Sequence, residues 1–176
     1  MLIGLCGPAG AGKNTVAELL GFRQASFAAP LYRMVAAMTG MTVRELQDRD
    51  RKEKPIDWIG KSPRELLQTL GTEWGRGMVA DDLWVKATMR EVVWRLRYGE
   101  NVAITDVRFP NEAQAVKDAG GLVVRVVRPG FECLAGGAGK HSSEAGIPDH
   151  LIDAEITNSG CLDGLRAAAE AVILKI

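Results

Sequence analysis

The stretch "GPAGAGKNT", residues 7–15, joins a short apolar run, "LIGLC" at residues 2–6, to a segment of helical character. Gly7, Gly12 and Lys13 occupy the fixed positions of G-x-x-x-x-G-K, the core of the phosphate-loop pattern G-x-x-x-x-G-K-[ST]. Glycines allow a tight turn that directs successive backbone N–H groups at phosphate oxygens, and the following helix adds its positive dipole end. The strand before and the helix after favour this interpretation over a glycine-rich turn without a ligand.

One position departs from that pattern, because Asn14 follows Lys13 where Ser or Thr is usual and the hydroxyl comes at Thr15. The resulting G-K-x-T resembles the loop of nucleoside monophosphate kinases of the adenylate kinase type. That resemblance implies that Thr15 contacts a phosphate while Mg²⁺ is held largely through water. The residues expected to contact ATP in this loop are Gly7, Ala9, Gly10, Ala11, Gly12, Lys13, Asn14 and Thr15.

The composition is typical of one globular domain. At 176 residues, with 47% hydrophobic and 25% charged residues, the chain is long enough to bury one core, so we expect a single domain over residues 1–176. Its 22 Lys and Arg balance 22 Asp and Glu. The densest basic stretch, "RDRKEKP" at residues 49–55, interleaves acids and is interpreted as a solvated loop. A binder of nucleic acid or of a membrane surface would carry a basic stripe, so neither partner is expected.

The cysteines and the N-terminus indicate a reducing compartment. Cys6, Cys133 and Cys161 show no close pairing, and with two histidines and no C-x-x-C the chain supports neither a disulfide framework nor a zinc site. The first apolar run has no basic residues before it and is too short for a signal peptide or a membrane span. We therefore expect a cytoplasmic protein.

Segments with strand character alternate with helical segments along the chain. Thr42 and Ser62 are expected N-caps, each followed three residues later by a Glu, and Ser62 begins a helix through "PRELLQTLGTEWG" at residues 63–75. This alternation predicts an α/β protein whose parallel sheet is covered by helices on both faces. The expected strands are "LIGLC" (2–6), part of "RQASFAA" (23–29), "NVAITD" (101–106), "LVVRVV" (122–127) and "AEITNSG" (154–160).

A phosphate loop alone does not distinguish a kinase from a motor or a GTPase, but the segment "AITDVRF" at residues 103–109 favours a phosphotransferase. A phosphotransferase must hold a second anionic substrate, which requires further arginines. Asp106 ends a strand, and Arg108 follows it at the carboxyl edge where open α/β sheets bind ligands. Asp106 is expected to orient Mg²⁺-bound water, and Asp106 and Thr15 are the expected metal-site residues. Arg108 is expected to pair with the acceptor phosphate. Taken alone, the pair is equally well a strand-end turn with a surface salt bridge.

A series of motifs in chain order resembles the phage-type deoxynucleoside monophosphate kinases, a branch of the P-loop nucleotide kinases. The resemblance implies a three-layer P-loop kinase fold with a lid segment and a helical monophosphate-binding region. It also implies transfer of the γ-phosphoryl group of ATP, with Mg²⁺, to a deoxynucleoside monophosphate. The motifs are "GPAGAGKNT", "SFAAPLYR", "KSPRELLQTLGTEWGR", "DDLW", "TDVRFPNEA", "VVRVVRP", "HSSE" and "ITNSG".

Within this resemblance, residues from about 30 to 80 form the monophosphate-binding region. Arg64 would hold the 5′-phosphate, and Gln68, four residues later on the same helix face, a base edge or the sugar. Trp74 would stack on a base, although a Trp beside leucines is more often part of the core. Arg33 is a weaker phosphate candidate, since it is also compatible with an exposed helix surface.

The remaining expected site residues follow the later strands. A segment without apolar periodicity, about residues 129–148, is the expected lid, with Lys140 and His141 within it. At its base Arg128, rather than Arg125, is expected to stabilise charge on the transferred phosphoryl group, which makes Lys13, Asp106, Arg108 and Arg128 the expected catalytic residues. The resemblance places Glu112 near the acceptor, although Glu112 is equally well a first-turn acid that serves its helix dipole. Asn158 is expected to lie beside the adenine.

Two alternatives remain open. One is another P-loop small-molecule kinase, such as a dephospho-coenzyme A kinase-like enzyme or a nucleoside kinase, which would share the donor residues and differ in the acceptor pocket. The other is a non-catalytic nucleotide-binding module, which would bind ATP without acceptor-dependent ADP release. The expected partners are small-molecule nucleotides, and the resemblance also suggests a homodimer.

Overall fold

The computed structural model describes residues 1–130 and 146–174. Most of the expected lid, including Lys140 and His141, lies outside these residues. The chain divides into two compact units, one formed by Met1–Ser26 and Met89–Ile176 and the other by Phe27–Thr88. The expected monophosphate-binding region falls within the second unit, and the single-domain organisation stays a prediction.

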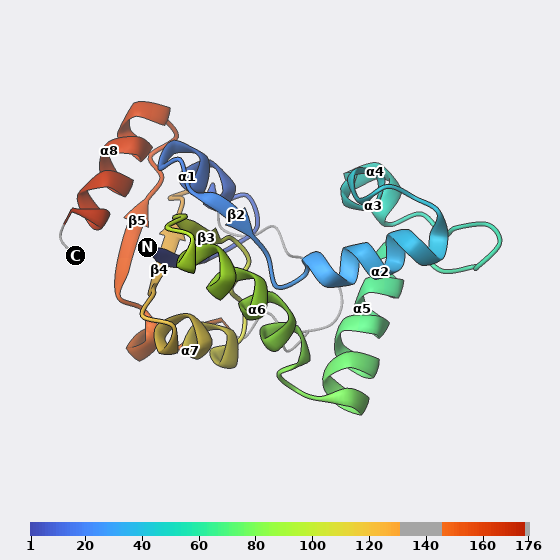
Figure 1. The fold of residues 1–176 in the computed structure, drawn as a ribbon. Coiled ribbons are helices and arrows are strands. Elements are labelled where there is room, and N and C mark those ends of the chain that lie inside the picture. The colour runs from blue at the N-terminus through green and yellow to red at the C-terminus, as the bar shows by residue number, and fades with distance from the viewer. Residues whose placement is uncertain (131–145, 175–176) are drawn as a thin grey trace. The chain divides into compact units, whose positions relative to one another are not determined.

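The first unit contains a five-stranded parallel sheet (Figure 1). The strand order is β2-β3-β1-β4-β5. The central strand is β1, with β2 and β3 on one side of it and β4 and β5 on the other. The chain therefore changes sides between β3 and β4, and open α/β sheets bind ligands at such a switch, beyond the carboxyl ends of the strands. The strands are β1 (Leu2–Cys6), β2 (Arg23–Ala25), β3 (Val102–Ile104), β4 (Leu122–Val127) and β5 (Ala154–Thr157).

Helices cover both faces of this sheet, which confirms the predicted three-layer α/β fold. Helices α1 (Lys13–Leu19) and α8 (Leu162–Ile173) pack on one face, and α7 (Pro110–Asp118) contacts β1 and β4 on the other. Because strand side chains alternate, Gly4 faces α7, where a Cβ atom would lie 3.0 Å from a methyl of Val116.

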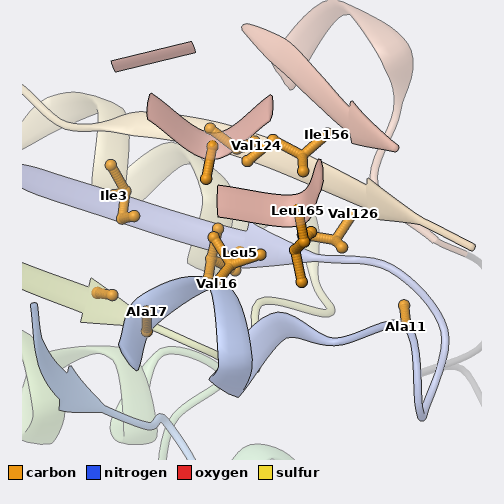
Figure 2. Close-up of a cluster of buried hydrophobic side chains, with 11 residues drawn as sticks. Ile3, Leu5, Ala11, Val16, Ala17, Val124, Val126, Ile156 and Leu165 are labelled. Carbon is orange, nitrogen blue, oxygen red and sulfur yellow. The ribbon is translucent and has the colours of Figure 1, made fainter. Parts of the chain in front are cut away.

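The principal core lies between the sheet and helices α1 and α8 (Figure 2). Each isoleucine or leucine that is fully buried there contributes about 2 kcal/mol through the apolar area removed from water. The core fixes the position at which β1 passes into the following loop and helix. Its members are Ile3, Leu5, Ala11, Val16, Ala17, Ala103, Val124, Val126, Ile156, Leu165 and Ala169.

The second unit is helical. Thr42 and Ser62 form the predicted capping boxes with Glu45 and Glu65. The solvated loop expected at residues 49–55 is wrong in part, because the Asp48 carboxylate accepts hydrogen bonds from the first backbone N–H groups and starts a short helix there. The helices are α2 (Ala29–Thr39), α3 (Val43–Gln47), α4 (Arg49–Lys52), α5 (Pro63–Gln68), the π-helix η1 (Thr69–Val79) and the first part of α6 (Leu83–Arg97).

The helix expected over residues 63–75 changes type at Gln68, where α5 ends and η1 begins. Trp84 packs against η1. Its indole Nε1 donates a hydrogen bond to the carbonyl of Gly71 at 2.8 Å. The ring also lies so close to Gly75 that a Cβ atom there would collide with it. Widened helical turns of this kind occur often at functional sites.

The helices of the described residues are all too short or too polar to cross a membrane.

Candidate active site

Because the strands are parallel, the residues that follow all five of them lie at one edge of the sheet, beyond the carboxyl ends of the strands. Each follows its strand within two positions: Ser26 after β2, Asp106 after β3, Gly7 after β1, Arg128 after β4 and Asn158 after β5. Four of these residues were predicted to belong to the site. Ser26 was not, because its place beside Asp106 depends on the pairing of β2 with β3.

The loop between β1 and α1 has the shape that its glycines require. Gly7 has a φ of 126°, and a Cβ atom there would collide with the carbonyl oxygen of Val126 on β4. Gly12 has a φ of 103°, another conformation that L side chains rarely adopt. Among the described residues no side chain caps α1 at Gly12, which leaves the backbone N–H groups at its start to bind an anion.

Lys13 folds back over this loop. Its Nζ donates hydrogen bonds to the carbonyl oxygens of Gly7 and Pro8, both at 2.8 Å. Burial lowers the pKa of Lys13, the positive charge of Arg108 lowers it further, and Cys6 and Asp106 oppose these effects. Lys13 and Arg108 are therefore near enough to repel each other, and a bound anion would relieve that repulsion.

The segment after β3 is held by two side chains. Ser26 Oγ donates a hydrogen bond to Asp106 Oδ2 at 2.7 Å. Glu112, only 3% exposed, accepts hydrogen bonds through Oε2 from the backbone N–H groups of Arg108 at 2.8 Å and Phe109 at 3.1 Å. Glu112 thus shows the contacts of a first-turn acid at the start of α7, one of its two interpretations, and its substrate role stays a prediction. The Arg108 side chain itself is exposed.

The end of β4 carries two arginines with different surroundings. Arg125 Nη2 donates hydrogen bonds to Asp149 Oδ1 at 2.7 Å and to the carbonyl of Ile147 at 3.2 Å, and the Asp149 contact raises the pKa of Arg125. Burial raises the pKa of the neighbouring Cys6 thiol, although Arg125 and Lys13 oppose that effect. Arg128 is half-buried just beyond the strand.

Asn158 is buried at the end of β5, with 7% of its surface exposed. Its Nδ2 donates a hydrogen bond to the carbonyl of Ala11 at 2.8 Å, and its Oδ1 accepts one from the Gly160 backbone N–H at 3.0 Å. The amide therefore contacts the phosphate loop, and its expected place beside the adenine stays a prediction.

Four of the residues expected to bind the acceptor, Arg33, Arg64, Gln68 and Trp74, lie in the second unit, whereas Arg108 and Glu112 lie in the first. Arg64 and Gln68 are exposed on α5, and Arg64 Nε lies 2.5 Å from Glu53 Oε1. Trp74 in η1 is 38% exposed, so it is not a core residue, and its ring centroid lies 6.3 Å from that of Trp84. Arg33 is exposed on α2. The buried tryptophan of this unit is Trp84, which the sequence offered only as part of "DDLW".

Comparisons with known proteins agree with this geometry. Residues 58–168 match the family described as "Deoxynucleotide monophosphate kinase". A putative deoxynucleotide monophosphate kinase of Acanthamoeba polyphaga mimivirus is 34% identical over 148 residues, covering 74% of this chain and 76% of that protein. The deoxynucleoside-5′-monophosphate kinase of Escherichia phage T5 is 28% identical over 236 residues, covering 94% of this chain and 92% of that protein.

A solved structure shows the fold independently. The dephospho-CoA kinase from Campylobacter jejuni superposes with a TM-score of 0.52 over 99% of this chain and 95% of that one, at 15% identity. An identity this low is informative about the fold alone. Because the family match covers more than half of the residues, the chain belongs to the deoxynucleotide monophosphate kinase family.

Proposed function

We propose that the protein transfers the γ-phosphoryl group of ATP to a deoxynucleoside monophosphate, giving the diphosphate and ADP, with the residue roles given below. The family supports an enzyme of this activity over a different small-molecule kinase or a non-catalytic module. The observation that carries the proposal is the meeting of Lys13, Arg108 and Asp106 at the edge of the sheet where the phosphate loop lies.

The loop binds the donor in this proposal. The backbone N–H groups of residues 7–15 contact the ATP phosphates, and Lys13 exchanges the carbonyl oxygens of Gly7 and Pro8 for phosphate oxygens. The exchange favours binding, because the charged Lys13 and Arg108 lie close together and a phosphate attracts both of them.

Mg²⁺ fits the donor set at this edge. Asp106 offers a half-buried carboxylate whose orientation is set by Ser26, and Thr15 offers a hydroxyl on the first turn of α1. Mg²⁺ is usually bound by one or two carboxylates together with water and substrate phosphates. When bound with ATP, Mg²⁺ would neutralise phosphate charge, and Asp106 and Thr15 would hold it.

The arginines stabilise charge that develops during transfer. Phosphoryl transfer needs positioning and electrostatic stabilisation rather than a covalent intermediate. Arg108 pairs with the acceptor phosphate, and Arg128, which follows β4 directly at the carboxyl end of the sheet, contacts the transferred group.

The second unit supplies the other acceptor contacts. Arg64 binds the 5′-phosphate, Gln68 contacts the base or sugar, Trp74 stacks on the base, and Arg33 gives further positive charge. The exposure of these side chains supports the assignment, because each is accessible to a ligand.

The direct test is ADP release from Mg-ATP with each of the four deoxynucleoside monophosphates added separately. A reaction without acceptor and reactions with the matching ribonucleotides serve as controls. Acceptor-dependent ADP release is the expected result, and its profile would give the base and sugar preference. ATP binding without acceptor-dependent release would contradict the proposal and favour the non-catalytic module.

We extend the proposal to the surroundings of the enzyme. Its partners are small-molecule nucleotides, it acts in the cytoplasm (that of the host if a phage encodes it), and it does not bind nucleic acid. The balanced charge supports the last point. We further propose a homodimer, which sedimentation equilibrium would test.

A further inference from the structure

The end of β5 is tied to the phosphate loop by one side chain. Asn158 is the first residue after β5, and its backbone N–H donates a hydrogen bond to the carbonyl of Val127 at 2.7 Å, which continues the pairing of β4 with β5. The position of its Cα is therefore fixed by the sheet. Its side chain is buried and extends to a segment 147 positions earlier in the chain.

Both polar atoms of the Asn158 side-chain amide form hydrogen bonds. Nδ2 donates to the carbonyl of Ala11 at 2.8 Å, and Oδ1 accepts from the Gly160 N–H at 3.0 Å. Ala11 is fully buried in the loop between β1 and α1 (Figure 2). A buried carbonyl that loses its donor costs about 1–3 kcal/mol, so this hydrogen bond favours one orientation of the Ala11–Gly12 peptide.

The amide also fits the shape of the loop. A Cβ atom on Gly12 would lie 2.6 Å from Asn158 Nδ2, so a glycine is needed there both for its φ of 103° and for the space that the amide takes. Gly12 is the residue before α1, and its carbonyl accepts the first helical hydrogen bond, from Val16, at 2.9 Å. Asn158 therefore packs against the point at which the loop becomes a helix.

We propose that Asn158 is a positioning residue that holds the phosphate loop in its anion-binding shape, and not a residue that recognises the adenine. The inference rests on the proposed function, because it assumes that the loop binds the ATP phosphates. A loop whose N–H groups converge before binding gains affinity, since the ligand need not order it. Removal of the amide should therefore weaken every ligand that uses the loop by the same factor, whatever its base.

The test compares three ligands that differ in the base. The affinities of ATP, inosine triphosphate and inorganic tripolyphosphate are measured by titration calorimetry with Mg²⁺, in the wild type, in Asn158→Ala and in the control Ser159→Ala. Ser159 is the exposed neighbour in the same turn. We expect Asn158→Ala to weaken all three ligands by about tenfold, the effect of one lost hydrogen bond, with the ratio of ATP to inosine triphosphate unchanged. Ser159→Ala should leave all three affinities within about twofold, as for an exposed substitution.

Two results would overturn the inference. If ATP weakens more than inosine triphosphate while tripolyphosphate keeps its affinity, Asn158 recognises the base. If no ligand weakens, Asn158 stabilises the fold without setting the loop. If Asn158→Ala does not fold, the neutral variant Asn158→Ser gives the same comparison: equal weakening of all three ligands supports the inference, and a changed ratio of ATP to inosine triphosphate or no weakening overturns it. Failure of the wild type to bind ATP would instead contradict the proposed function.

Discussion

The sheet edge of the first unit and the helical second unit hold their candidate residues in different ways. At the sheet edge, Lys13, Glu112 and Asn158 each bond to backbone atoms, and Glu112 and Asn158 are buried. In the second unit, Arg64 pairs with the carboxylate of Glu53, and both side chains are more than half exposed, at 59% and 57%.

This difference indicates two ways of preparing a site. Contacts to the backbone fix the donor loop before a ligand arrives, so its dipoles need little reorganisation. An exposed ion pair contributes about 0–1 kcal/mol, so Arg64 can leave Glu53 for a phosphate at little cost. We therefore expect substitutions at the sheet edge to abolish the reaction, and substitutions in the second unit to weaken the acceptor selectively.

The largest expected effect is that of Lys13→Ala, which tests whether the sheet edge of the first unit binds and activates ATP. We expect kcat/KM to fall by about a thousandfold, as when a group that stabilises transferred charge is removed. The melting temperature of the ligand-free protein should not fall: burial and Arg108 lower the pKa of Lys13, so at neutral pH its charge destabilises the folded state. ADP release and thermal unfolding measure the two quantities. Turnover like that of the wild type would contradict the phosphate-loop assignment.

Arg64→Ala tests whether the second unit binds the acceptor nucleotide. We expect the KM for the deoxynucleoside monophosphate to rise by about thirtyfold, which corresponds to a charge-assisted hydrogen bond of about 2 kcal/mol. The KM for ATP should change little.

The matched control for Arg64→Ala is Glu53→Ala, which breaks the same ion pair but keeps the arginine. Its KM for the monophosphate should stay within about twofold of the wild type, because an exposed pair is weak. Steady-state kinetics with either substrate varied separates these cases. A selective effect of Arg64→Ala on ATP would show that α5 serves the other substrate.

Trp84→Phe would sharpen the comparison, because Trp84 is a buried anchor in a unit whose other candidate residues are exposed. The change removes the indole donor from the carbonyl of Gly71, so we expect the free energy of unfolding to fall by about 1.5 kcal/mol. The control Trp58→Phe alters a side chain that is 69% exposed and should have an effect within about 0.5 kcal/mol. Urea unfolding measures both, and equal effects would argue against Trp84 as the anchor.

The smallest effect concerns Asp153, which directly precedes β5 and so lies at the amino end of that strand, away from the candidate site. Burial raises the pKa of Asp153, but Lys117 and the Val123 N–H outweigh burial and hold it below its ordinary value. Such a carboxylate contributes full stability above its unfolded pKa of about 4, and that contribution is lost as the pH falls through the lower folded value. Urea unfolding between about pH 2 and pH 5 should therefore show a steeper loss of stability in the wild type than in Asp153→Asn. Equal slopes would contradict this, and activity at neutral pH should not change.

Local patterns predicted a large part of this molecule. Residues close together in the chain predicted the phosphate loop, the capping boxes at Thr42 and Ser62, and the strands that end just before Asp106 and Arg128. All of these are confirmed as structural elements. Such elements are predictable because a cap or a tight turn depends on groups a few positions apart. The family resemblance, on the same motifs, is confirmed as well.

Patterns along the chain predicted the loop, the α/β alternation and the family, whereas the surroundings of the site residues depend largely on tertiary packing. The strand order places Ser26 beside Asp106 and Asn158 on the Ala11 carbonyl. Packing of Trp84 against Gly71 and Gly75 likewise accompanies the change from α5 to a π-helix, which no local propensity indicated. These contacts join residues that are distant in sequence, so they depend on how whole strands and helices pack and not on any pattern along the chain.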